Sequence, residues 1–336
     1  MQNKIYQNIT DQIIDQLERV DLSNYTKPWF CVGHSPVNIR GTAYRGINHI
    51  LLAATANKSN MCATFNQWKE KDCYVKKGER SQMVVLWKFF DETDDNGEST
   101  GKHGAVMTKY FRVFNSEQIE GDFARDVEKK FKEKLKDHDP IAEGEKFING
   151  YIKNERLPVH NSDRAYYSSG IKEHIAMPEI GQFKDPAQYY SVFAHEITHS
   201  TANKNRLDRD LSGRFGDRSY AFEELVAELG SAMICGTLGI EQRPREDHAQ
   251  YIKSWLSCLR NDNKFIISAA SKAQKATDFT LKAAGYDLDN SVNITPPVKE
   301  KEREILPVPV DVSQNTPPDP LRSPVAQPRS GKPGIN

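Results

Sequence analysis

A pair of histidines spaced for a helix constrains this chain of 336 residues more than any other feature of its sequence. The run His195-Glu196-Ile197-Thr198-His199 lies in a segment, SVFAHEITHSTA, that contains no glycine or proline and is therefore predicted to be helical. Histidines four residues apart on a helix lie on the same face, so both imidazoles can reach one Zn²⁺ at roughly 2.0 to 2.1 Å. A zinc site at this helix then needs a third ligand from elsewhere in the chain.

An extended HExxHxxGxxH pattern does not supply that ligand, because its two further positions are Ala202 and Asn205. The next strongly helical stretch carries Glu224 and Glu228, which share one face at a spacing of four residues. Two acids turned toward a pair of histidines would be costly to bury unless a cation lies between them. Zinc would provide that charge.

This arrangement resembles the gluzincin metallopeptidases, in which a glutamate from a second helix is the third zinc ligand. The resemblance implies that Glu224 is the ligand, with Glu223 as the alternative, and that Glu228 orients the ring of His195. It also implies that Glu196 is the general base that takes a proton from water during attack on a peptide or amide carbonyl.

A residue that stabilises the transition state is not evident from the motif. Tyr166, Tyr167 and His174 lie on strand-like pieces before it and are candidates, although ordinary strand packing explains them equally well. If 171–177 is an exposed edge strand above the zinc, it could pair with an extended substrate.

The bulk composition narrows the setting. Lys and Arg total 46, as do Asp and Glu, so net charge indicates neither a nucleic acid nor a membrane partner. The five cysteines are scattered and never spaced as CxxC, which argues against a disulfide framework and fits a reducing cytoplasm. No apolar stretch approaches 18 residues and no signal peptide is visible, so we expect a cytoplasmic protein without a membrane segment.

Periodicity and composition divide the chain into elements and domains. Strands are expected at 82–90 and 105–114, paired with each other, with a polar excursion at 91–104 between them. Amphipathic helices are expected at 5–20, 46–58, 186–202, 220–238, 245–260 and 264–284. The predicted divisions are a first domain at 1–120, a charged helical linker at 121–147, a second domain at 148–287 and a proline-rich disordered tail at 288–336.

The first domain is locally basic. Between Lys27 and Lys88 there are ten Lys or Arg residues against three acids, interleaved with aromatic residues. Cations follow a phosphate backbone while aromatic rings stack on unpaired bases, so the mixture suits a single-strand binder. A basic face over an ordinary aromatic core fits the same composition.

Several runs, taken in order, resemble the ArdC-like antirestriction proteins, a plasmid and phage family related to TraC-type primases. In the first half these are NIRGTAYRGIN at 38–48, TFNQW at 64–68, VKKGE at 75–79 and YFRVFN at 110–115. In the second half they are HEITHST, RLDR at 206–209, YAFEELVAELGSA at 220–232 and SKAQKATDF at 271–279. The resemblance implies binding of incoming single-stranded DNA, its protection from restriction and an attached metallopeptidase domain. Carried over onto the first motifs, it implies DNA contacts by Arg40, Tyr44, Arg45, Asn48, Lys76 and Lys77.

The sequence therefore predicts an α+β protein with an N-terminal α/β DNA-binding domain and a gluzincin-like domain of helices and a small antiparallel sheet. Its predicted partners are single-stranded DNA and an unidentified protein substrate, and its predicted cofactor is Zn²⁺. The alternative is a DNA-binding or primase-associated protein whose zinc site is structural or inactive.

Overall fold

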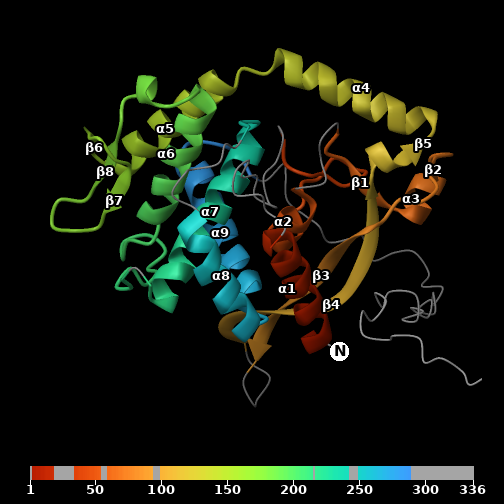
Figure 1. Ribbon diagram of the computed structural model, residues 1–336, viewed down its shortest axis with the longest axis horizontal. Helices are drawn as coiled ribbons and strands as arrows, with labels where there is room; N and C mark the ends of the chain where they lie inside the picture. The colour runs from red at the N-terminus through yellow and green to blue at the C-terminus, as the bar shows by residue number, and fades with distance from the viewer. Residues whose placement is uncertain are drawn as a thin grey trace, which may run out of the picture. The chain divides into compact units, whose positions relative to one another are not determined.

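The computed structural model describes residues 2–18, 34–53, 59–93, 99–214, 216–241 and 249–288, which lie in one compact unit. Helices and small sheets are mixed along the chain, so the predicted α+β class is confirmed. Figure 1 shows the strands of the first half on one side of this unit and most of the helices of the second half on the other. The proline-rich tail predicted at 288–336 lies, apart from its first residue, outside the described residues.

The first half is built around a long hairpin. Strands β3 (Gln82–Thr93) and β4 (Ser99–Asn115) pair antiparallel, as predicted, and β1 (Cys62–Thr64) pairs with the end of β4. The excursion predicted at 91–104 is wrong at both ends, because the ladder of backbone hydrogen bonds continues through these polar residues; its middle lies outside the described residues. The short helix α3 (Phe65–Lys69) and the pair β2 (Tyr74–Val75) and β5 (Ile119–Glu120) complete this part.

Helices from both halves share one hydrophobic core. The apolar positions of α1 (Gln2–Glu18) that the sequence places on one face, such as Ile9 and Ile13, are fully buried. They pack in the same cluster as residues of α2 (Ile47–Ala53), β3, α7 (Arg218–Leu238), α8 (Ala249–Asn261) and α9 (Phe265–Ala283). The division into domains at 120 and 148 stays a prediction.

Two helices occupy the region predicted to be a charged linker. Helix α4 (Asp122–Asp137) is mostly exposed and buries Ala124 and Phe131. Helix α5 (Pro140–Glu155) begins at Pro140, where the side chain of Asp139 accepts hydrogen bonds from the first backbone amides. It packs against α6 (Pro186–Ser200) and α9. Figure 1 shows α4 along the upper edge, between β5 and α5.

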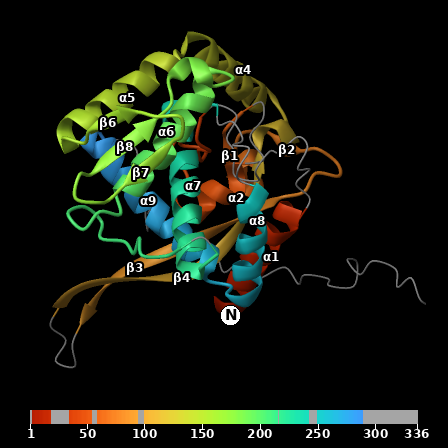
Figure 2. The same cartoon turned by 60° about the vertical axis from the view of Figure 1, so that its left-hand side comes forward.

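The first strands of the second half form a three-stranded sheet. Its order is β6 (Val159–Asn161), β8 (His174–Met177), β7 (Tyr166–Ser168), and β6 runs parallel to β8 while β7 runs antiparallel to it. The sheet is therefore mixed and not antiparallel as predicted, and the condition that 171–177 be an exposed edge strand is not met, because β8 is central. The edge strand beside α6 is β7 (Figure 2).

Close contact between α6 and α7 brings the two predicted metal-binding helices together. The two helices cross at Gly230, where an added Cβ would lie 2.6 Å from the Thr198 side chain of α6. Beside it the Ser231 hydroxyl donates to the Ser191 carbonyl at 2.7 Å. Only glycine permits this approach, which brings the acids of α7 to the histidines of α6. No helix among the described residues is both long and apolar enough to span a membrane.

Candidate metal centre

Helix α6 presents both motif histidines to the same point. The Nε2 atoms of His195 and His199 are 3.1 Å apart, and the two rings stand nearly perpendicular at an interplanar angle of 80°. The residues around them on the helix are buried, since the segment has apolar residues on most of its faces. The helical spacing predicted from the sequence therefore gives two converging nitrogen atoms.

Helix α7 supplies a carboxylate to these nitrogens. One oxygen of Glu224 lies 3.7 Å from Nε2 of His195, and the other lies 3.6 Å from Nε2 of His199. A tetrahedral ion with bonds of roughly 2.0 to 2.1 Å separates its ligand atoms by about 3.3 Å. The three side chains thus fit a divalent ion without large movement, and they form a group whose ligand atoms all lie within 4.8 Å of one another.

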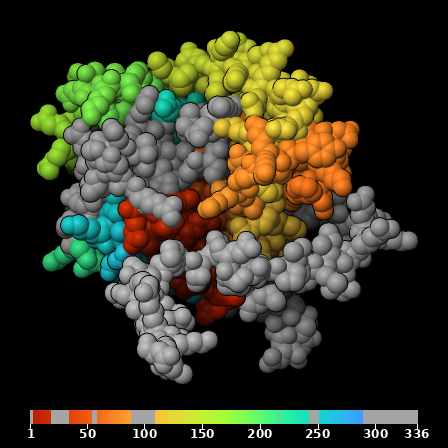
Figure 3. Space-filling view, turned by 45° about the vertical axis from the view of Figure 1, so that its right-hand side comes forward, coloured from red at the N-terminus to blue at the C-terminus, as the bar shows by residue number. Residues whose placement is uncertain are grey.

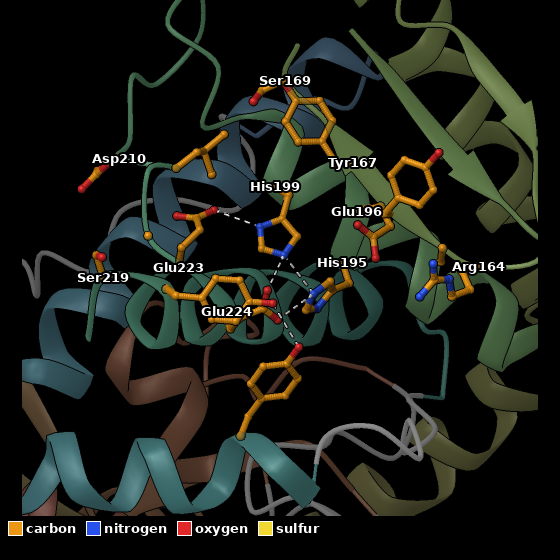
Figure 4. Close-up of a pocket in the computed structure, with 16 residues that line it drawn as sticks. Arg164, Tyr167, Ser169, His195, Glu196, His199, Asp210, Ser219, Glu223 and Glu224 are labelled. Atoms are coloured by element: carbon orange, nitrogen blue, oxygen red, sulfur yellow. Dashed lines mark hydrogen bonds and ion pairs between the residues drawn. The ribbon is translucent and has the colours of Figure 1, made fainter. Parts of the chain in front are cut away.

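The other nitrogen of each histidine faces a further acid on α7. Nδ1 of His195 is 3.7 Å from Glu228, the residue predicted to orient this ring, and Nδ1 of His199 is 3.1 Å from Glu223. Glu223, the alternative ligand in the sequence interpretation, therefore contacts the side of the ring opposite the metal-facing nitrogen (Figure 4). A carboxylate in that position fixes the tautomer and the plane of the ring.

Arg209 holds Glu223 in place. Its Nε donates to one Glu223 oxygen at 2.9 Å and its Nη2 to the other at 2.8 Å, an arrangement in which both partners are buried. The guanidinium also donates to the Thr201 hydroxyl and to the Thr198 carbonyl at the end of α6. The motif RLDR thus contains a buried cation tied to the metal site, a role that no sequence pattern had assigned.

Two acids of the site, Glu223 and Glu224, have lowered pKa values. Burial opposes ionisation of Glu224, but hydrogen bonding from His195 and the charges of both histidines outweigh it and lower the pKa of Glu224 to about 2. Burial likewise opposes ionisation of Glu223, while Arg209 and His199 lower its pKa. Both carboxylates are therefore available as anions at neutral pH, one for a cation and one for the imidazole.

An open cleft of about 430 Å³ gives access to the candidate ligands. Glu196 lines it beside them, as the sequence predicts for a general base, and so do Tyr166 and Tyr167 from β7. His174 does not line the cleft; its Nδ1 lies 2.8 Å from the Lys172 carbonyl. The Tyr167 hydroxyl is already engaged, because it donates to Glu173 at 2.7 Å.

Two tyrosines that the sequence analysis did not single out also line the cleft. The Tyr220 hydroxyl interacts with the Glu224 carboxylate and lies 3.2 Å from the Tyr251 hydroxyl of α8. Tyr220 precedes Glu224 by one helical turn, a spacing visible in the sequence, whereas Tyr251 reaches the cleft only through the packing of α8.

Comparison with known proteins assigns both halves. Residues 3–114 match the family model of the N-terminal domain of anti-restriction factor ArdC, and residues 147–272 match that of a zincin-like metallopeptidase. The crystal structure of the metal-free antirestriction protein ArdC from plasmid R388 is 34% identical, with a TM-score of 0.61, and the match covers 83% of this chain and 97% of that one. The chain belongs to the ArdC family of antirestriction proteins.

Other relatives extend this family. An uncharacterized protein, y4eC, of Sinorhizobium fredii is 38% identical over 82% of this chain and 91% of its own length. Two Escherichia coli DNA primases TraC are each 31% identical, but the chain spans only 27% and 19% of their lengths. The R388 ArdC protein has also been solved with Mn(II) bound, at 35% identity over 98% of its chain with a TM-score of 0.61. Together with the zincin-like match, that structure supports a divalent-metal site here.

The ArdC-type N-terminal motifs place the predicted DNA contacts in different environments. Tyr44 is buried with its hydroxyl 3.3 Å from the Cys62 carbonyl, and Asn48 is buried with both side-chain amide atoms bonded at 2.8 Å to the backbone of Val85. Tyr44 thus bonds to β1 and Asn48 to the edge of β3, and contact of either residue with DNA stays a prediction. Without the Asn48 side chain, the backbone N–H and C=O of Val85 would be unpaired at this edge of β3.

The four cations among these predicted contacts also differ. Arg40 and Lys77 are exposed. Lys76 donates to the Glu117 carbonyl at 2.7 Å, and Arg45 forms an ion pair with Asp278 of α9. The structure thus leaves two of the six predicted contacts fully available to a ligand, and DNA binding by any of them stays a prediction.

Proposed function

We propose that this ArdC-family chain is a zinc metallopeptidase that also binds single-stranded DNA and protects DNA entering a cell. The observation that carries the peptidase half is the convergence of His195, His199 and Glu224 beside Glu196 in an open cleft.

Zinc is the metal that we propose for this site. Two imidazoles and one carboxylate that leave an open fourth position are the donor set of catalytic zinc hydrolases. When bound, a zinc ion polarises a carbonyl and lowers the pKa of water to about 7. The proposal requires only a small adjustment, because the two Nε2 atoms are 3.1 Å apart and each lies within 3.7 Å of one oxygen of Glu224.

The protein groups around the ligands would divide the remaining work. Glu196 would take the proton of the attacking water and pass it to the departing amine. The hydroxyl of Tyr220 would donate a hydrogen bond to the carbonyl oxygen as it gains charge, a contribution worth about 2.7 to 4 kcal/mol in other hydrolases. The edge of β7 that has no partner strand among the described residues lies next to the cleft and would pair with an extended peptide backbone.

A fluorescent casein assay tests the peptidase proposal. We expect zinc-loaded wild-type protein to cleave casein and Glu196→Gln to lose the activity while retaining the metal. Glu133→Gln, an exposed change on α4, removes the same charge far from the histidines and should keep full activity. Loss of activity in Glu133→Gln, or retention in Glu196→Gln, contradicts the assignment.

The DNA-binding half rests on exposed aromatic and basic side chains. Four successive residues of β4, Lys109-Tyr110-Phe111-Arg112, are exposed, and Tyr74 on the neighbouring β2 is 57% exposed. Figure 3 shows the surface of α3 and β2, in orange, next to that of β4 and α4, in gold and yellow. Exposed rings stack on unpaired bases and cations contact phosphates, so this surface suits single-stranded DNA.

Fluorescence anisotropy with a labelled oligothymidine tests that half. We expect single strands to bind more tightly than a duplex of equal length, with an affinity that falls steeply as salt increases. Replacing Tyr110 and Phe111 together by Ser should weaken binding by at least about tenfold, since each stacked base contributes about 1 to 3 kcal/mol. Equal affinity for duplex, or no effect of the double change, argues against this surface.

A second function is favoured by the TraC relatives, in which the matched region is a minor part of a primase. The chain would then bind DNA beside replication enzymes, and its metal site would be structural or idle. If Glu196→Gln protects incoming plasmid DNA as well as wild type does, and wild type cleaves no protein, this second function is the better one.

A further inference from the structure

A groove beside α9 lies outside the surface and the cleft described so far. It has a volume of about 290 Å³, and α9 forms one wall while α1 and β3 contribute the opposite side through Tyr6 and Trp87. The run SKAQKATDF, which resembles a family motif but has no role in the metal site, forms part of the α9 wall. The groove is therefore lined by elements that lie far apart in the sequence.

The α9 wall is strongly basic. Lys264, Lys272 and Lys275 line the groove, and no described residue of its lining is acidic. Lys264 precedes the helix, and Ser268, Lys272 and Lys275 follow at spacings of four, four and three residues, so they lie on one helical face. Three cations with no facing acid repel one another, and they create a positive potential that attracts a polyanion.

Aromatic rings line the groove opposite these cations. Trp87 is half-buried and packs against the shared core with one part of its side chain, as does Tyr6. The ammonium group of Lys264 lies 5.8 Å from the centre of the Tyr6 ring. Rings anchored in a core at one edge and open to a groove at the other are suited to stacking on planar groups.

The groove continues toward the metal cleft. A second groove of about 550 Å³ shares Lys264, Ser268 and Lys272 with it and reaches Asp210 and Glu223, which also line the metal cleft. Of these two grooves only the second has acidic lining residues, which stand beside an equal number of cations, so a polyanion is favoured more in the first groove.

The α9 wall is also tied to the N-terminal DNA-binding motif. The Gln274 side chain accepts a hydrogen bond from the Gly46 amide at 2.7 Å, and Asp278 pairs with Arg45. Asp278 is the only acid of α9, it does not line the groove, and its charge is neutralised by Arg45.

We propose that the α9 groove binds single-stranded nucleic acid, with Lys272 and Lys275 on consecutive phosphates and a base stacked on Trp87. This inference deepens the DNA-binding part of the proposed function and rests on it. A peptide is the less suitable occupant, because the groove offers neither acids for basic side chains nor an unpaired strand edge among its described lining residues.

The test compares Lys272→Ala/Lys275→Ala with Lys153→Ala/Lys204→Ala, a pair of equally exposed lysines outside the groove. Binding of a fluorescein-labelled 20-nucleotide oligothymidine is measured between about 0.05 and 0.3 M salt. Loss of two phosphate contacts should lower the slope of log affinity against log salt by about 1.4 and the affinity at 0.1 M salt by about 25-fold. The control pair should match wild type, and both variants should keep the wild-type melting temperature.

Photocrosslinking gives an independent measurement. An oligothymidine carrying 5-iodouracil should crosslink to Trp87 or Tyr6, as mapped by mass spectrometry, and Trp87→Leu should abolish the crosslink at that position. If wild type binds the oligonucleotide and the groove variant binds it equally well, with no crosslink in the groove, the inference is overturned while the DNA-binding proposal stands. If wild type binds no single-stranded DNA, both fail. If only casein binding weakens in the groove variant, the groove serves a protein and the inference is overturned.

Discussion

Arg209 is predicted to stabilise the metal site through Glu223 and not through the metal itself. Arg209→Met removes a buried cation that donates to both oxygens of Glu223, and leaves that carboxylate buried beside His199. In the native protein, Arg209 and His199 lower the pKa of Glu223. Arg209→Met would therefore remove the main partner of the Glu223 charge. The imidazole of His199 would then be held less firmly toward the metal.

The magnitude follows from the burial of the pair. Removing one partner of a buried ion pair typically costs about 3 to 5 kcal/mol of unfolding free energy, and loss of a residue that orients a metal ligand lowers metal affinity by about 10- to 100-fold. In a Glu223→Gln background, residue 223 carries no negative charge that the loss of Arg209 could leave unpaired. Arg209→Met should then cost at least about 2 kcal/mol less than it does in wild type.

Urea unfolding in the presence of a chelator measures the free energy of unfolding. Competition with a fluorescent zinc chelator measures the zinc affinity. Arg218→Met is a matched control, because it breaks an exposed pair with Asp262 and should cost no more than about 1 kcal/mol. Arg209→Lys keeps the charge and serves if Arg209→Met does not fold. Additive effects of Arg209→Met and Glu223→Gln on both quantities would refute the coupling.

Three further predictions concern the packing that supports the site. Gly230→Ala should cost about 1 to 3 kcal/mol and weaken zinc binding, because its Cβ would lie 2.6 Å from a buried side chain of α6, whereas Gly181→Ala, with nothing within 4 Å, should be neutral in urea unfolding. Burial lowers the pKa of His49 to about 4, so the unfolded chain gains a proton first as pH falls from about 6.5 to 4 and stability is lost in that window. Between pH 7 and 5 wild type should lose about 2 kcal/mol more than His49→Gln, and equal losses would contradict the assignment. Asn48→Ala should lower the melting temperature, because two hydrogen bonds to Val85 are lost. An unchanged melting temperature with weaker DNA binding would instead indicate that Asn48 contacts DNA.

The grouping of the candidate metal ligands was accessible to sequence reasoning because it depends on local helical spacing. His195 and His199 lie one turn apart on a helix without breaks, and the next strongly helical stretch carries acids at the same spacing. The choice of Glu224 over Glu223 came from the family resemblance, and the two acids point differently because adjacent helical residues differ by about 100° in direction. That rotation sends one acid to the metal-facing nitrogens and the other to the back of His199.

Features that depend on loops and strand order were not accessible. Arg209 reaches Glu223 because the chain after α6 turns back, with Asp208 in a left-handed conformation and the Arg209 amide bonded to the Ala202 carbonyl at 3.0 Å. The central position of β8 depends on the parallel strand β6, whose residues are exposed and carry no alternating pattern.

Buried polar residues are a further limit of sequence reasoning. Composition cannot distinguish Asn48, which bonds to a strand edge, from an asparagine that contacts a base, because both need the same donor and acceptor. The charged helix at 122–137 was predictable from its pattern, but α5 was not separated from it, since Asp139 and Pro140 begin a new helix only two residues later.

The central claim is that His195, His199 and Glu224 hold one divalent ion. Wild type, Glu224→Ala and Glu133→Ala are dialysed against the same free zinc concentration and the bound metal is counted by mass spectrometry. We predict about one zinc ion per chain in wild type and in Glu133→Ala, and less than about a tenth of that in Glu224→Ala. Equal zinc in all three proteins, or none in wild type, would contradict the account.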